Sequence, residues 1–168
     1  MTSREMVVDT ETTGLSPLTD RIICIGTSMP QRRATHTFME KTEKETLQAF
    51  WDYVFELNIT TLIGFNLGFD WGFLKLRSLK YGIRIRHFDR YKERKDLMVL
   101  LNSYERYPKG KLKDYADFFG FPCEDSISGA DVPELFKAGK FDEICRHLES
   151  DVLLTTKIWE RCKECELV

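Results

Sequence analysis

Two carboxylates one residue apart follow a short apolar run near the start of the chain. Asp9 and Glu11 lie within the segment Met6–Leu15, whose hydrophobic beginning is typical of a buried strand. Residues i and i+2 of a strand point to the same face, so these two side chains lie on one face. Like charges held this close are unfavourable unless a cation or a proton lies between them. A solvated strand end is the simpler interpretation of such a pair when it stands alone.

A third acid, Asp70, lies where a predicted strand over residues 60–65 passes into a helix. Ligand sites in open α/β sheets gather at the carboxyl ends of strands. If this strand runs parallel to the first, Asp70 and the nearby Asn66 arrive close to Asp9 and Glu11. An acid favoured by the dipole at a helix N-terminus is the alternative interpretation of Asp70 alone.

The fourth acid lies on a long predicted helix near the end of the sequence. His147 and Asp151 are i and i+4, which places them about 40° apart around a helix of 3.6 residues per turn. They share a face with the apolar residues Ile144, Leu154 and Ile158. A carboxylate on or beside a buried stripe is costly unless it is paired or binds a cation. A histidine bonded to Asp151 for structural reasons is the alternative.

Three segments of the sequence thus supply four acids that could converge. They are Asp9, Glu11, Asp70 and Asp151. Four carboxylates cannot gather as bare anions without a matching cationic cluster, and hard oxygen ligands suit Mg²⁺ or Mn²⁺. Two such ions, about 3.5–4 Å apart, activate a water and stabilise a leaving oxygen in phosphodiester hydrolysis. The pattern predicts two-metal phosphoryl transfer to water.

The elements that must position these acids indicate an α/β fold. Strands are expected over 6–11, 21–29, 34–39 and 60–65, and helices from Thr42 (with Glu45 completing a capping box), over 69–81, 96–103, 112–119, 131–138 and 141–162. After the first strand, a polar turn signal covers Thr12, Thr13 and Gly14, with Gly14 free to adopt a positive φ. Three strands, then helix–strand–helix, then helices predict a mixed sheet of about five strands covered on both faces.

Composition sets modest limits. The 168 residues, 42% of them hydrophobic, fit one domain with a proper core, and the net charge of −2 leaves any nucleic-acid surface to be local. No apolar run approaches the roughly 18 residues of a membrane span, and no signal-peptide stretch opens the chain. Five mostly scattered cysteines fit reduced thiols, so we expect a cytoplasmic protein. Cys162 and Cys165 have zinc-type spacing but no second pair to complete a site.

In order along the chain, these motifs resemble those of the DEDD superfamily of 3′–5′ exonucleases. The resemblance rests on V-V-D-T-E-T-T-G at 7–14, on G-F-N-x-x-F-D at 64–70 and on the acid of the late helix. Segments 94–98, 111–116, 119–122, 132–135 and 150–152 are similar to exonuclease domains related to B-family DNA polymerase proofreading domains. The resemblance covers nearly the whole chain. It implies an RNase H-like three-layer fold, with residues 1–168 as a single 3′–5′ exonuclease domain.

The resemblance also implies residue roles. Asp9 would bridge two divalent cations, Glu11 and Asp151 would complete the site of one, and Asp70 would act at the other through water. The residues expected to hold or wedge the terminal nucleotide are Thr12, Thr13, Gly14, Leu15 and Asn66.

His147 departs from the family pattern. The polymerase-like branch has a tyrosine four residues before the last Asp, which is the place of His147. The other branch has a histidine five residues before it, where this chain has Arg146. A neutral imidazole, with an ordinary pKa of about 6.5, can take a proton from water, and nearby metal ions would keep it neutral. We expect His147 to be the general base.

Two basic segments are candidates for contact with the substrate. Residues 83–95 carry six Lys or Arg against two acids, with aromatic residues interleaved, and Lys109, Lys111 and Lys113 form a second group. Lysine and arginine neutralise phosphates, and rings stack on single-strand bases. A solvated face, or an exposed edge strand at 83–86, is the alternative for the first segment.

The sequence therefore favours a metal-dependent 3′–5′ exonuclease acting on single-stranded 3′ ends, with DNA favoured over RNA. A catalytically silent nucleic-acid-binding or scaffold domain of the same fold is one alternative. A structure-selective nuclease of the wider RNase H-like group is another. No membrane is expected as a partner, whereas a second copy of the chain, a polymerase or a repair protein stays open.

Overall fold

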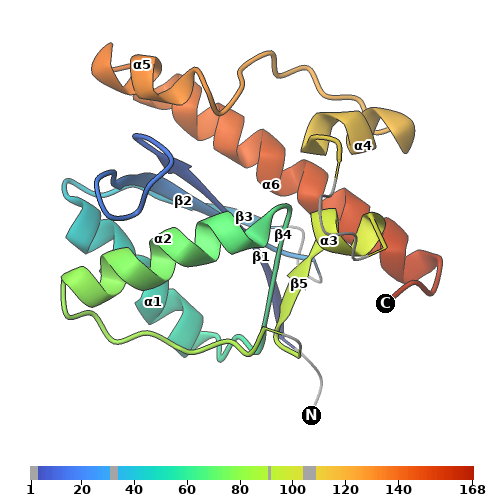
Figure 1. Ribbon diagram of the computed structural model, residues 1–168, viewed down its shortest axis with the longest axis horizontal. Coiled ribbons are helices and arrows are strands. Elements are labelled where there is room, and N and C mark those ends of the chain that lie inside the picture. The colour runs from blue at the N-terminus through green and yellow to red at the C-terminus, as the bar shows by residue number, and fades with distance from the viewer. Residues whose placement is uncertain (1–3, 31–33, 91, 104–108) are drawn as a thin grey trace.

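A mixed sheet forms the centre of the molecule (Figure 1). The computed structural model describes residues 4–30, 34–90, 92–103 and 109–168. Within these ranges the sheet has the order β3-β2-β1-β4-β5. The strands are β1 (Glu5–Thr12), β2 (Ile22–Met29), β3 (Ala34–Phe38), β4 (Thr61–Gly64) and β5 (Arg94–Asp96). β2 pairs antiparallel with both β1 and β3, whereas β4 is parallel to β1 and to β5. The parallel β1–β4 pairing is the arrangement that brings Asp70 to the end of β1.

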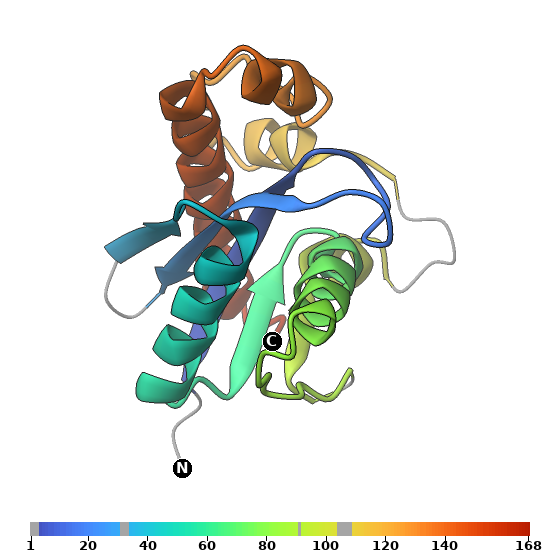
Figure 2. The same ribbon diagram turned by 90° about the vertical axis from the view of Figure 1, so that its left-hand side faces the viewer.

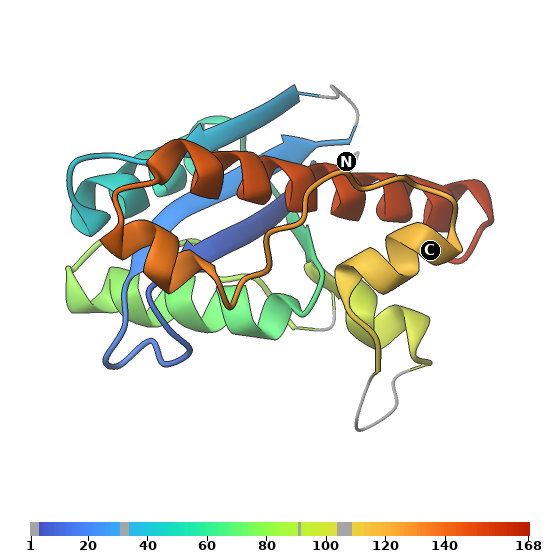
Figure 3. The same cartoon turned by 90° about the horizontal axis from the view of Figure 1, so that it is seen from above.

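Helices cover both faces of this sheet (Figures 2 and 3). They are α1 (Glu43–Glu56), α2 (Leu67–Lys80), α3 (Leu97–Leu101), α4 (Leu112–Phe118), α5 (Val132–Lys137) and α6 (Phe141–Glu164). One apolar cluster lies between the sheet and α1 and α2, and a second lies between the sheet and α6. The short helices α4 and α5 pack against α6. The predicted α/β, RNase H-like three-layer arrangement is confirmed.

The central strand β1 is buried along both faces because its side chains alternate between the two clusters. Met6 and Val8 pack on the α1–α2 side, and Val7 packs on the α6 side. The two-residue period of a strand carries Asp9 and Glu11 onto the face of Val7, toward α6. The prediction that the two acids share a face is confirmed.

The start of β1 is tied to the end of α6. Glu5 Oε2 accepts hydrogen bonds from Trp159 Nε1 at 3.1 Å and from Lys163 Nζ at 3.0 Å. Halfway along, α6 approaches β2 closely because Gly26 has no side chain. A Cβ atom at Gly26 would lie 2.8 Å from side-chain atoms of both Leu148 and Val152. The helix that carries His147 is therefore seated directly on the sheet.

A buried ion pair joins α1 and α2. Arg77 donates to both carboxylate oxygens of Glu43, at 2.8 and 2.7 Å, and Glu43 also accepts from Tyr81 and from the amide of Ile22. Burial raises the pKa of Glu43, but these hydrogen bonds outweigh it, and the net pKa is lowered. Arg77 also donates to the carbonyl of Pro17, at 3.3 Å. The pair thus supports the loop between β1 and β2.

One helix begins where the sequence predicts, another begins earlier, and one predicted alternative, an edge strand, is not found. The predicted capping box of Thr42 and Glu45 is present at the start of α1. α2 begins at Leu67 rather than at Phe69, after Asn66 in the left-handed region with φ 60°. The alternative of an edge strand at 83–86 is wrong: no strand covers these residues, Ile83 is buried against the α1–α2 side of the sheet, and the edge strands are β3 and β5.

Two smaller observations concern the cysteines and membranes. All five cysteines are free thiols, with Cys162 buried and Cys165 exposed. Across the described ranges, no helix is both long and apolar enough to cross a membrane.

Candidate active site

The acidic site forms where β1 ends beside α2. Asp70 Oδ1 accepts hydrogen bonds from the amide of Thr10, at 2.9 Å, and from its hydroxyl, at 2.7 Å. Because Thr10 lies between Asp9 and Glu11, this contact brings Asp70 to the same strand end. Asp70 and Glu11 are only 3% and 6% exposed. The predicted meeting of the strand pair with the α2 acid is therefore found in the structure.

Helix α6 supplies the remaining acid and the histidine. His147 Nε2 lies 3.4 Å from Glu11 Oε1 and 3.9 Å from Asp151 Oδ2. His147 is 2% exposed, whereas the Asp151 side chain is 19% exposed. The four predicted acids and the predicted base thus converge from β1, α2 and α6.

Burial and mutual repulsion disfavour the charged forms of these acids. Burial, followed by the charges of Asp151 and Asp70, raises the pKa of Glu11 to about 8. Burial also raises the pKa of Asp70 to about 7, although the hydrogen bonds from Thr10 oppose it. The pKa values of Asp9 and Asp151 lie above the ordinary range, again chiefly because of burial. The charge of Lys113 lowers the pKa values of Glu11 and Asp151 but does not outweigh burial, so further cations or protons are needed to balance the cluster.

The donor set fits a hard divalent cation. Asp151 Oδ1 is buried and has no hydrogen-bond partner among the described residues, so this oxygen is available to a ligand. Asp125, His147 and Asp151 also offer ligand atoms within 4.8 Å of one another. Carboxylate oxygens from several elements are the ligands that Mg²⁺ and Mn²⁺ prefer. This cluster is therefore where the chain could hold a divalent cation.

The structure corrects the interpretation of the His147 surroundings. The hydrogen-bond partner of His147 is Asp125, whose Oδ2 lies 2.6 Å from Nδ1, and Asp151 is beyond hydrogen-bond distance. Asp125 lies on the irregular segment between α4 and α5. Asp125 could not be found from sequence spacing, because it lies 22 residues from His147 and in no periodic element. The acidic segment at 124–125 was the one visible signal.

The turn after β1 holds a leucine outward. Thr13 and Arg21 bond each other twice across the turn, through Thr13 N to Arg21 O at 2.9 Å and Arg21 N to Thr13 Oγ1 at 3.0 Å. Thr12 Oγ1 donates to the carbonyl of Gly14 at 2.7 Å. Leu15 is 86% exposed beyond this brace. An exposed leucine on a braced turn is suited to contact with a base.

The reason for a glycine at position 14 is a close contact rather than an unusual backbone angle. Gly14 does not use its freedom to adopt a positive φ, which is found instead at Gly82, Gly110, Gly120 and Gly139. A Cβ atom at Gly14 would lie 2.5 Å from the carboxylate of Asp20, which accepts from the amide of Ser16. Glycine is required by this close approach.

Asn66 stands at the carboxyl end of β4, next to α2. The backbone amide of Asn66 donates to Asp96 Oδ1 at 3.0 Å, whereas the Asn66 side chain makes no capping hydrogen bond to α2. The side chain is exposed, as a substrate contact requires.

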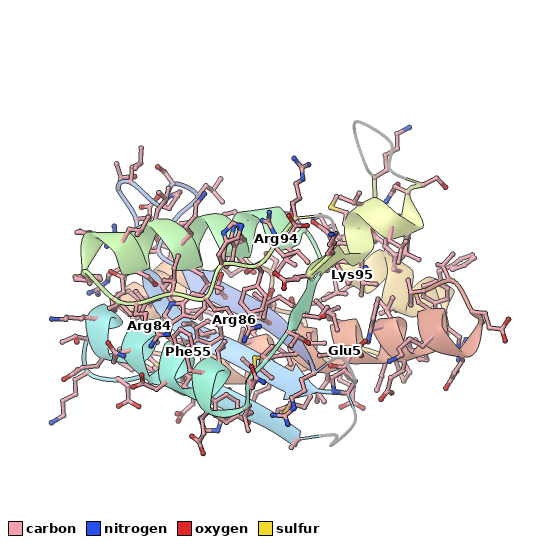
Figure 4. All side chains as sticks on the ribbon, turned by 90° about the horizontal axis from the view of Figure 1, so that it is seen from below. Glu5, Phe55, Arg84, Arg86, Arg94 and Lys95 are labelled. Carbon is pink, nitrogen blue, oxygen red and sulfur yellow. The ribbon has the colours of Figure 1, made fainter. Side chains whose placement is uncertain are left out.

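The two basic segments have different positions. Arg84 lies 4.6 Å from the ring centre of Phe55, and Arg86 bonds Asn58, so both lie near the amino ends of the parallel strands (Figure 4). Arg94 and Lys95 are in β5 and line a groove of about 930 Å³ along that edge. Tyr91 lies outside the described residues.

One lysine of the second basic segment, Lys113, contacts the site. Lys113 Nζ lies 3.1 Å from Asp125 Oδ2, the atom that contacts His147. Lys109 and Lys111 are exposed beside it in the sequence.

Comparison with known proteins agrees with this geometry. The chain is similar in fold to the family B DNA polymerase of the hyperthermophilic archaeon Pyrobaculum calidifontis, with a TM-score of 0.81 and 21% identity over 96% of this chain. It spans about a quarter (25%) of that polymerase. An uncharacterized protein of Methanocaldococcus jannaschii is 40% identical over 96% of this chain and 97% of its own length. Residues 21–166 match the model of predicted 3′–5′ exonucleases related to the exonuclease domain of PolB. With that match across most of its length, the chain belongs to this family of predicted 3′–5′ exonucleases.

Proposed function

We propose that this protein is a metal-dependent exonuclease that hydrolyses phosphodiester bonds at the 3′ end of single-stranded nucleic acid, with DNA favoured over RNA. The observation that carries the proposal is the convergence of Asp9, Glu11, Asp70 and Asp151 beside His147. Raised pKa values throughout this cluster support a site built for cations rather than a set of structural acids.

Each acid has a role by its position. Asp9, whose charge neighbours are Asp70, Glu11 and Asp151, would be shared by two divalent cations, Mg²⁺ or Mn²⁺. Glu11 and Asp151 would complete one cation site, and Asp70 would serve the second through water. Such cations supply an activated water and stabilise the leaving oxygen.

His147 would act as the general base. Its Nε2 faces Glu11 and Asp151, and its Nδ1 is occupied by Asp125. A water bound between these carboxylates would lie within reach of Nε2, which would accept its proton during attack on the phosphorus. Burial of the ring excludes bulk water as a competing base.

Terminal recognition would come from the turn and from α2. Leu15 would wedge against the last base, and the braced turn at Thr12, Thr13 and Gly14 would hold the terminal nucleotide. Asn66 would contact the substrate from the neighbouring strand end. Such a site favours ends over internal cleavage, which separates this proposal from a structure-selective nuclease.

Two further attributes belong to this proposal. Free thiols at all five cysteines support a reducing, cytoplasmic setting. A small exonuclease would become more processive with a second copy of the chain, or with a polymerase or repair protein as partner.

The test is a time course on 5′-labelled single-stranded DNA and RNA with Mg²⁺, Mn²⁺ or EDTA. We expect a metal-dependent ladder shortening from the 3′ end, which also reads out the preferred sugar. Asp9→Asn should abolish the ladder, and Asp117→Asn, an exposed acid on α4, should leave it unchanged. Binding of both strands without any cleavage would replace the proposal with the catalytically silent domain.

A further inference from the structure

Asp125 is held from three sides although it lies on an irregular segment. Its Oδ1 accepts from the amide of Ile127 at 3.0 Å. Its Oδ2 accepts from Lys113 Nζ at 3.1 Å and contacts His147 Nδ1 at 2.6 Å. Lys113 is itself fixed, because its ammonium also donates to the carbonyls of Asp125 and Ile127. This is more organisation than a solvated loop acid requires.

The chemistry of the contact decides which ring nitrogen of His147 carries hydrogen. A carboxylate accepts hydrogen bonds and cannot donate them, so Nδ1 must be the donor. In a neutral imidazole the lone pair then lies on Nε2. Nε2 is the atom that faces Glu11 and Asp151, at 3.4 and 3.9 Å.

The Asp125 carboxylate keeps its charge in this setting. Burial raises its pKa, but the hydrogen bonds from His147, Ile127 and Lys113 outweigh burial, and the net pKa lies below the ordinary value. This contrasts with the raised pKa of Asp151, one turn from His147. Asp125 and Asp151, two of the three acids near the histidine, are therefore not equivalent.

We propose that Asp125 is a positioning residue that fixes His147 with hydrogen on Nδ1 and the lone pair of Nε2 toward the acidic cluster, and that Lys113 locks Asp125 in place. The inference rests on the proposed function for its catalytic meaning, since a general base must present a lone pair to its water. The carboxylate–histidine contact follows the general rule that a reacting or ligating imidazole is oriented by a partner on its other nitrogen.

The first experiment needs no nuclease activity. Long-range ¹H–¹⁵N NMR spectra of the ¹⁵N-labelled, EDTA-treated full chain would be recorded at about pH 8, above the ordinary histidine pKa. The chain has three histidines, and His147→Gln assigns the signals of the third. We expect Nδ1 of His147 to be protonated and Nε2 unprotonated. In Asp125→Ala, the ring should shift toward the Nε2–H form, whereas Asp117→Asn should leave it as in the parent protein.

The second experiment measures kinetics on a single-stranded 3′ end. Asp125→Ala should lower kcat by about tenfold to a hundredfold, with KM and the Mn²⁺ dissociation constant changed less than about twofold. Lys113→Met should lower kcat less, since it loosens Asp125 without removing it. Unfolding curves for each variant separate loss of fold from loss of orientation, and Lys113→Met serves where Asp125→Ala does not fold.

The outcomes are distinct. An unchanged ring tautomer and an unchanged kcat in Asp125→Ala would overturn the inference. A large loss of Mn²⁺ affinity with the tautomer unchanged would also overturn it and make Asp125 a metal ligand. If the parent protein has no nuclease activity but Asp125 sets the tautomer, the proposed function fails and the positioning role stands.

Discussion

Thr10 donates both its amide and its hydroxyl hydrogen bonds to one carboxylate oxygen of Asp70, at 2.9 and 2.7 Å. These two bonds fix α2 to the central strand. The residue between the two acids of β1 thus aligns the third.

Removing the Thr10 hydroxyl should therefore weaken both the site and the fold. Thr10→Val keeps the shape of the side chain and deletes one bond to Asp70. We expect the free energy of unfolding to fall by about 1–2 kcal/mol and kcat to fall several-fold. The matched control is Thr156→Val, a buried threonine whose hydroxyl bonds Val152 O within α6. Urea unfolding and initial rates measure both effects, and equal losses in the two variants would contradict the assignment.

The stability of the metal-free protein should fall as the pH rises. The pKa of Glu11 is raised from 4.5 to about 8, and that of Asp70 from 3.8 to about 7. Between these limits the folded chain holds protons that the unfolded chain has released, so the slope of unfolding free energy against pH is negative. Thermal unfolding in EDTA from pH 5 to pH 8 measures it. A Tm that rises over this interval would contradict the raised pKa values.

A divalent cation should reverse this loss. It replaces the protons of the cluster, so its effect should be larger at pH 8 than at pH 5. At 100 times its Kd, a cation stabilises the fold by about 2.7 kcal/mol, which raises Tm by about 5–10 °C in a chain of this size. Glu11→Gln should raise Tm in EDTA at pH 8 and reduce the response to Mn²⁺. The same Mn²⁺ response in the parent and in Glu11→Gln would exclude Glu11 as a ligand.

Leu15 should matter for substrate and not for folding. It is 86% exposed, so Leu15→Ala should leave the unfolding free energy within about 0.5 kcal/mol. We expect KM for a single-stranded 3′ end to rise several-fold because a contact with the last base is lost. Leu79→Ala, on α2 and also exposed, is the control. Unchanged KM for Leu15→Ala would remove the wedge from the proposal.

Charge reversal should show which of the two basic segments contacts the nucleic-acid substrate. Lys111 neighbours Lys113, which is tied to the site, whereas Arg84 packs on Phe55 near the opposite ends of the parallel strands. Lys111→Glu should raise KM and flatten its salt dependence, since a phosphate contact is lost. Arg84→Glu should change neither. The reverse result would assign the substrate path to the first segment, and an unchanged salt slope in both would dismiss both.

The ion pair of Arg77 and Glu43 should be costly to break. Arg77→Ala leaves a buried carboxylate without its main partner and should lower the unfolding free energy by about 3–5 kcal/mol. The double variant Arg77→Met with Glu43→Leu should be far less destabilised than Arg77→Ala, because no buried charge remains. Urea unfolding of the single and double variants tests this, and equal losses would contradict it.

Local periodicity made much of the site predictable. The two-residue period of a strand places Asp9 and Glu11 on one face, and the i, i+4 spacing of a helix places His147 beside Asp151. The capping box at Thr42 is equally local, so α1 begins where expected. For Asp70 to lie beside Asp9 and Glu11, β4 had to run parallel to β1, and the structure confirms that it does.

Features that depend on long-range packing could not be predicted. β5 has three residues and no alternating pattern, and it forms because β4 offers an edge to it. Asp125 contacts His147 through an irregular segment whose course is fixed by Lys113 and Ile127. No spacing rule links residues 22 apart across such a segment.

The tie between Glu5 and the far end of α6 makes the first strand and the last helix a single rigid unit, joined again at Glu11 and His147. Lys163 lies 16 residues beyond His147, about 24 Å along the helix at 1.5 Å per residue. The position of His147 relative to Glu11 therefore depends on the contacts of Glu5 with Trp159 and Lys163 at the other end of the strand and helix. Substitutions at Glu5 or Lys163 should therefore shift Glu11 relative to His147, although both positions lie far from that contact.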